Sequence, residues 1–131
     1  MKHVMIYDNF NLKKFITGVI LKRKTFDDKT YNLFLITKVK HDYSNLDIFI
    51  YQIGYTNIYF DNIHFIYNKE GNFLMNKWFT NEYEYLTDDE YKIILNYISN
   101  CQEYILEKIK KDTNIDISTY PLKYDINKYN L

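Results

Sequence analysis

The first two thirds of the chain alternate between apolar or aromatic and polar positions, with many Ile, Val, Thr, Tyr and Phe residues, as β-strands do. Short connections between consecutive strands favour antiparallel hairpins. Positions 12–20 also fit helical spacing, but the β-branched residues there and Gly18 favour a strand. The pattern predicts six strands, at residues 3–7, 15–24, 31–40, 46–53, 58–67 and 73–79.

Two polar segments between these strands predict turns. In residues 68–72, Gly71 can adopt the left-handed conformation of a short loop, which predicts a hairpin between 63–67 and 73–79. Residues 27–29 predict a second turn, which joins strands 15–24 and 31–40.

After residue 86 the apolar period becomes helical. Thr87 and Glu90 have the spacing of a capping box, and Leu86 and Tyr91 that of a hydrophobic staple. Acidic residues at the start and lysines near residue 110 suit the helix dipole. We therefore expect one long helix of about 25 residues, at 88–111. Its apolar stripe contains Tyr91, Ile94, Leu95, Ile98, Cys101, Ile105 and Ile109.

These elements predict an α+β fold, in which an antiparallel sheet of five or six strands packs against one long C-terminal helix. The 131 residues contain no repeat and no Ser, Pro or Gly linker, so we expect a single domain. Its sheet is expected at about 3–79, its helix at about 88–111 and an extended tail at 113–131. Alternation at Ile115 and Ile117 leaves open an edge strand in that tail.

The composition indicates origin more than chemistry. The chain has no alanine, one arginine, three glycines and one proline beside 15 Tyr and 9 Phe, which indicates an AT-rich genome. The formal net charge is zero, so no global field attracts nucleic acid or an anionic membrane. The single cysteine, the absence of an apolar signal segment after Met1 and the lack of a long apolar run predict a cytoplasmic protein without a membrane span.

Residues suited to catalysis are scattered. His3, His41 and His64 lack the spacing of metal ligands, and Cys101 falls on the helical stripe, where a buried and unreactive thiol is expected. Because the three glycines stand alone, no phosphate-binding loop is predicted. We expect no metal, no cofactor and no enzymatic activity. A small enzyme with a site around His41, His64 and Asp61 remains an alternative.

A second alternative is a nucleic-acid-binding accessory protein that uses basic N-terminal strands. Lys22, Arg23 and Lys24 would form one group, at the turn end of the first hairpin. The remaining lysines of these strands are Lys13, Lys14, Lys38 and Lys40, and the last two fall at the opposite end of the hairpin. One arginine and zero net charge argue against a binding groove.

Residues 78–91 carry the strongest candidate for a binding surface. Five carboxylates lie between Lys77 and Lys92 without a cation among them, interleaved with aromatic residues. Aromatic side chains provide contact area, and carboxylates complement a basic partner. The predicted partner-binding residues are Trp78, Phe79, Glu82, Tyr83, Glu84, Tyr85, Asp88 and Asp89. In the competing interpretation these residues have only structural roles, in the hydrophobic core and at the start of the helix.

The composition resembles that of small proteins from phages and other mobile elements of AT-rich bacteria. Many such proteins bind and block a host or rival protein, as anti-CRISPR and toxin-immunity proteins do. The leading hypothesis is therefore a non-enzymatic protein-binding inhibitor that acts on a partner with a basic surface. Its oligomeric state is left open.

Overall fold

The computed structural model describes residues 16–42, 45–68, 71–75 and 77–119, without the side chains of 42, 45, 77–79 and 119. The predicted strand at 3–7 and most of the tail lie outside this part. No helix in the described ranges is long and apolar enough to cross a membrane.

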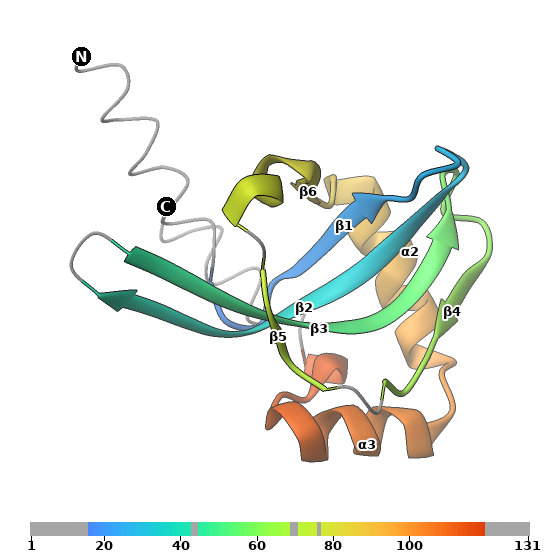
Figure 1. The fold of residues 1–131 in the computed structure, drawn as a ribbon. Helices are drawn as coiled ribbons and strands as arrows, with labels where there is room; N and C mark the ends of the chain where they lie inside the picture. The colour runs from blue at the N-terminus through green and yellow to red at the C-terminus, as the bar shows by residue number, and fades with distance from the viewer. Residues whose placement is uncertain (1–15, 43–44, 69–70, 76, 120–131) are drawn as a thin grey trace.

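Six antiparallel strands form one sheet in the order β4-β3-β2-β1-β6, with β5 paired to β3 beside this path (Figure 1). The predicted α+β class and antiparallel sheet are therefore confirmed. The strands are β1 (Ile20–Lys24), β2 (Thr30–Asp42), β3 (Asn45–Asn57), β4 (Ile63–Phe65), β5 (Phe73–Leu74) and β6 (Tyr83–Tyr85).

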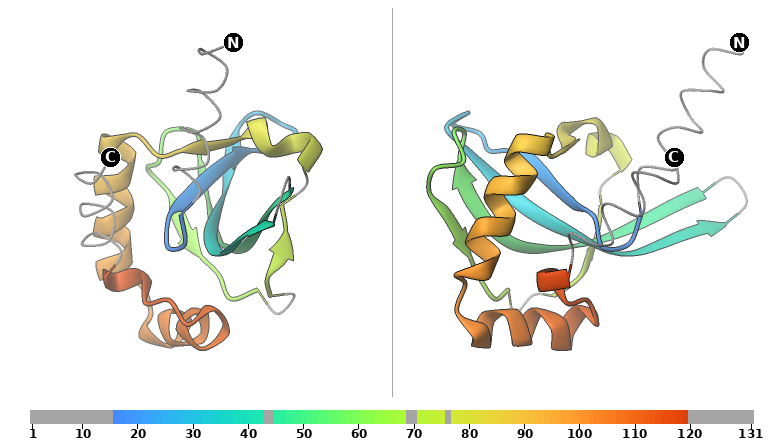
Figure 2. Two further views of the ribbon diagram at one scale, coloured as in Figure 1. Left: turned by 90° about the vertical axis from the view of Figure 1, so that its left-hand side faces the viewer. Right: turned by 180° about the vertical axis from the view of Figure 1, so that it is seen from behind.

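The long β2–β3 hairpin determines the shape of the sheet. Register shifts between Leu33 and Phe34, and between Ile36 and Lys38, interrupt its ladder. Such bulges bend a strand and increase its twist. The sheet consequently curls (Figure 2). Apolar side chains are buried on both of its faces.

Because successive side chains of a strand point to opposite faces, the sheet has one apolar core on each face. On one face, Ile20, Leu33 and Leu35 pack under the helices with Tyr51 and Ile53. The neighbouring positions on the same strands point to the other face, where they form the second core inside the curl. The residues of this second core are Val19, Leu21, Phe34, Ile36, Ile48, Ile50, Met75 and Tyr83.

The single long helix that we expected at 88–111 is wrong. The chain instead forms α2 (Asp88–Ser99) and α3 (Glu103–Thr113), which lie at a steep angle to each other (Figures 1 and 2). At the break, the side chains of Ser99 and Asn100 both donate to the Asn96 carbonyl, at 2.7 and 3.0 Å. Such local bonds compete with helix continuation. Gln102 is extended, so α3 begins in a new direction.

The predicted hairpin between 63–67 and 73–79 is also wrong. Gly71 has the expected positive φ of 72°, but β4 and β5 each pair with β3 and not with each other. Residues 58–62 form a turn, in which Phe60 is buried at φ 57°, so β4 begins only at Ile63. After β5 the chain forms a 3-10 helix, η1 (Lys77–Glu82), in place of a continued strand.

The described part of the tail, residues 114–119, follows α3 and forms no strand of the sheet. Residues Ile117–Thr119 form a short 3-10 helix, η2, where we had considered an edge strand. Ile115 and Ile117 are nevertheless buried, and they pack in the core that α2 and α3 cover.

Candidate functional site

The candidate surface lies where the edge strand β6 leads into α2. β6 pairs with β1, and after Leu86 the capping box of α2 forms as predicted: Glu90 donates its N–H to Thr87 Oγ1 at 3.2 Å, and the Glu90 carboxylate accepts from the Thr87 N–H at 2.9 Å. Leu86 and Tyr91 are both buried in the same core, as a hydrophobic staple requires.

The structure divides the predicted partner-binding residues into two groups. Glu82, Glu84, Asp88 and Asp89 are exposed. Tyr83 is only 8% exposed and packs edge-on against Phe34, with ring centroids 5.4 Å apart, inside the second core. These four carboxylates therefore reach solvent, whereas the ring of Tyr83 does not.

Of the other three aromatic residues predicted to bind a partner, only Tyr85 has a described side chain. Tyr85 is half-buried and packs against the second core. Trp78 and Phe79 belong to η1, but their side chains lie outside the described part of the structure.

Cations from β1 neutralise two of the five carboxylates. Arg23 Nη2 lies 2.7 Å from Glu82 Oε2, and both groups are partly exposed. Desolvation lowers the pKa of Arg23, but the hydrogen bonds to Glu82 and Tyr83 outweigh this effect and raise the pKa above its usual value. Lys22 Nζ lies 2.8 Å from both oxygens of Glu90. The sequence segment lacks a cation, yet the fold places two cations of β1 against its carboxylates.

Lys22 is a structural residue. It is only 7% exposed, and its ammonium lies 4.8 Å from the ring centre of Tyr31 and 5.6 Å from that of Phe60. A buried ammonium of this kind needs its counter-ion, and Glu90 provides it. Lys22 is therefore not available to a phosphate backbone.

A hollow of about 740 Å³ borders this surface. It is lined by Arg23, Lys24, Thr25, Phe26, Asp28, Asn32 and Glu82. Phe26 is fully exposed at 108%. Phe26 was not among the predicted binding residues, although an apolar side chain within the polar turn at 25–29 was a signal that could have revealed it.

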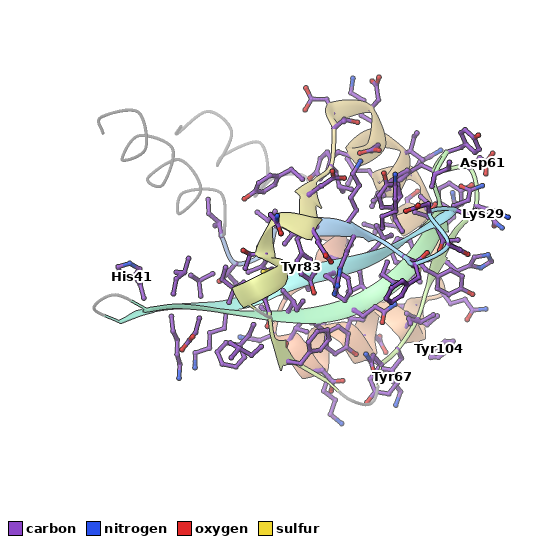
Figure 3. The ribbon with its side chains drawn as sticks, turned by 45° about the horizontal axis from the view of Figure 1, so that its top comes forward. Lys29, His41, Asp61, Tyr67, Tyr83 and Tyr104 are labelled. Carbon is purple, nitrogen blue, oxygen red and sulfur yellow. The ribbon has the colours of Figure 1, made fainter. Side chains whose placement is uncertain are left out.

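The alternative catalytic residues are not brought together. His41 lies near the end of β2, opposite Leu46, whereas His64 on β4 lies opposite Tyr55 and stacks on its ring. Leu46 and Tyr55 are nine positions apart in β3, which is roughly 30 Å along the strand. Figure 3 shows His41 and Asp61 at opposite ends of the molecule. Among the described residues, no group of three His, Cys, Asp or Glu side chains could hold a metal ion.

Cys101 lies at the α2–α3 junction, and not within a helix as expected. It is half-buried, and its Sγ lies 3.7 Å from the Gln102 carbonyl. Desolvation by burial raises the pKa of its thiol. This makes it less nucleophilic at neutral pH.

The basic residues of the first strands do not form one groove in the described part. Lys22 and Arg23 face carboxylates. Lys38 and Lys40 are exposed on the distant part of β2, and Lys13 and Lys14 fall outside the described residues.

Comparisons with known proteins identify no relative: no family model matches the sequence, and no match was found among curated proteins or solved structures.

Proposed function

We propose that this protein is a non-enzymatic protein-binding inhibitor, encoded by a phage or mobile element of an AT-rich bacterium and active in the host cytoplasm. It would act against a host or rival protein, as anti-CRISPR or immunity proteins do. The partner would carry a basic surface, and the binding residues would lie along β6 and the first turn of α2.

The observation that supports this proposal is the exposure of the carboxylates around the β6 edge. Glu84 and Asp89 are exposed, and neither is within 4 Å of a described cation. Glu82 connects this acidic edge to the hollow that presents Phe26. Exposed charges of one sign steer association with a surface of the opposite sign.

The test compares two double variants of equal charge. Glu84→Gln with Asp89→Asn neutralises the acidic edge, and Glu103→Gln with Glu107→Gln neutralises two exposed carboxylates of α3. Wild type and both variants would be used as bait in extracts of the natural host, and association rates would be measured on the purified captured protein. We expect a roughly tenfold slower association for the first variant only, and a weaker dependence on salt.

Equal rates for both variants would contradict the proposal. A short labelled oligonucleotide tests the nucleic-acid alternative by fluorescence anisotropy. If wild type binds it and Lys24→Gln with Lys29→Gln does not, the protein is better described as a nucleic-acid-binding protein.

A further inference from the structure

Phe26 is displayed at the tip of the β1–β2 turn. Its side chain is 108% exposed, and no described residue stacks on its ring. A phenyl ring in water forgoes the free energy of burial. In this position the ring makes no contribution to either core of the fold.

The turn that carries Phe26 is well ordered by hydrogen bonds. Asp28 donates its N–H to the Thr25 carbonyl at 3.1 Å, and Asp27 Oδ1 accepts from the Thr25 hydroxyl and the Lys29 N–H. The hydrogen bonds from the Thr25 hydroxyl and the Lys29 N–H lower the pKa of Asp27, which keeps its carboxylate charged. Little conformational freedom is then left to lose when the turn binds a partner.

A second exposed aromatic residue lies on the neighbouring loop at the same end of the sheet. Tyr59 is 75% exposed, and it precedes Phe60, which is buried and anchors the loop. The Ile58 N–H donates to the Lys29 carbonyl at 3.1 Å, so the two loops are joined (Figures 1 and 3). The result is one end of the molecule with two aromatic side chains on constrained loops.

The charges of these two loops determine which kind of partner surface they can bind. Residues 25–29 and 58–62 contain three exposed carboxylates, on Asp27, Asp28 and Asp61, and one ammonium, on Lys29. An anionic lipid surface would be repelled by this excess. A protein pocket with an apolar floor and basic borders would match both the aromatic rings and the carboxylates.

We infer that the end of the sheet formed by residues 25–29 and 58–62 is a docking surface, on which Phe26 inserts into an apolar pocket of a protein partner bordered by Lys or Arg. The inference rests on the proposed function and deepens it, because it assigns the anchor that the acidic edge lacks once Tyr83 is found in the core. Aromatic side chains that enter such pockets dominate binding energy at interfaces.

The experiment introduces the photocrosslinker p-benzoylphenylalanine at position 26, with the same residue at Tyr104 as the control. Tyr104 is 58% exposed on α3. Irradiation in an extract of the natural host, followed by mass spectrometry, identifies the captured protein and the peptide that contacts position 26. Affinities are then measured with that purified protein for Phe26→Ala, Phe26→Leu, Tyr59→Ala and Tyr104→Ala. Circular dichroism checks that each variant is folded.

We expect an adduct from position 26 on a peptide that lines an apolar pocket with basic borders. Phe26→Ala should weaken binding roughly 30-fold or more, Phe26→Leu and Tyr59→Ala less, and Tyr104→Ala not measurably. The inference is overturned if position 26 gives no protein adduct beyond that of position 104, or if Phe26→Ala binds as wild type does. It is also overturned if Phe26 is instead required for sedimentation with phosphatidylcholine and phosphatidylglycerol vesicles.

The variants separate this inference from the proposed function. If Phe26→Ala loses binding while Glu84→Gln with Asp89→Asn does not, the anchor stands and the acidic edge is not part of the interface. If instead Glu84→Gln with Asp89→Asn loses binding and Phe26→Ala does not, the acidic edge belongs to the interface and Phe26 is not its anchor.

Discussion

The ammonium group of Lys22 lies 2.8 Å from both carboxylate oxygens of Glu90, which is 68 residues later in the chain. Glu90 Oε1 also accepts the Thr87 N–H, so a single carboxylate completes the cap of α2 and neutralises a buried cation of β1. This contact attaches the start of the helix to the sheet.

Glu90→Gln is expected to destabilise the protein by roughly 3 kcal/mol, because Gln can still accept from Thr87 but leaves the Lys22 ammonium without a counter-ion. Urea denaturation measures the change. Glu82→Gln is the matched control: its ion pair with Arg23 is partly exposed, so the loss should stay below about 1 kcal/mol. Equal losses for the two variants would contradict the structural role of Lys22. Lys22→Met combined with Glu90→Gln should recover part of the stability.

Thr87→Ala removes the side-chain acceptor for the Glu90 N–H and should destabilise the protein by about 0.5 to 2 kcal/mol. Thr87→Ser retains the hydroxyl and should be close to wild type. Thermal unfolding followed by circular dichroism gives the comparison, and identical melting temperatures for Ala and Ser would argue against the cap.

Ile98→Ala should cost about 2 to 5 kcal/mol, because Ile98 is 3% exposed in the core that α2 covers. Tyr104→Ala, on the exposed side of α3, should change the free energy of unfolding by less than about 0.5 kcal/mol. Denaturant midpoints would show the difference. A neutral Ile98→Ala would mean that α2 does not pack on the sheet as described.

Cys101 should react slowly with a thiol reagent in the folded protein and faster after denaturant is added. Its pKa is raised by burial, so less thiolate is present at neutral pH, and the labelling rate should continue to rise at pH values where an ordinary thiol is already ionised. Absorbance of the released chromophore follows the reaction. Rapid stoichiometric labelling of folded protein at neutral pH would contradict this expectation.

The free energy of unfolding should decrease at alkaline pH because Tyr51 ionises less readily in the folded protein than in the unfolded chain. Burial raises its pKa to about 12, from about 10 when unfolded, so its contribution is fully present below pH 10 and is lost as the pH rises towards 12. The phenol lies 3.1 Å from the Asn68 carbonyl and 3.3 Å from Asp112. Urea midpoints measured across this range should fall less steeply for Tyr51→Phe than for wild type. Parallel profiles would contradict the assignment.

Features set by residues close together in the chain were predicted from the sequence. The Thr87 cap involves atoms within four residues, and the turn at 27–29 connects β1 and β2 as expected. Alternation of apolar residues correctly indicated an antiparallel sheet in an α+β fold. In each case the stabilising contacts are local, so the pattern of neighbouring residues contains the information.

Only the tertiary structure decided which strands meet and which side chains remain in water. β5 pairs with β3, Lys22 finds Glu90, Tyr83 enters the second core and Phe26 stays exposed. The strand pairings and the burial of Lys22 and Tyr83 depend on contacts between residues far apart in the chain, and periodicity specifies which face of an element is apolar but not what will cover it. The helix break has a different origin, because local side-chain bonds from Ser99 and Asn100 to Asn96, together with the packing of α3, interrupt a continuous apolar stripe.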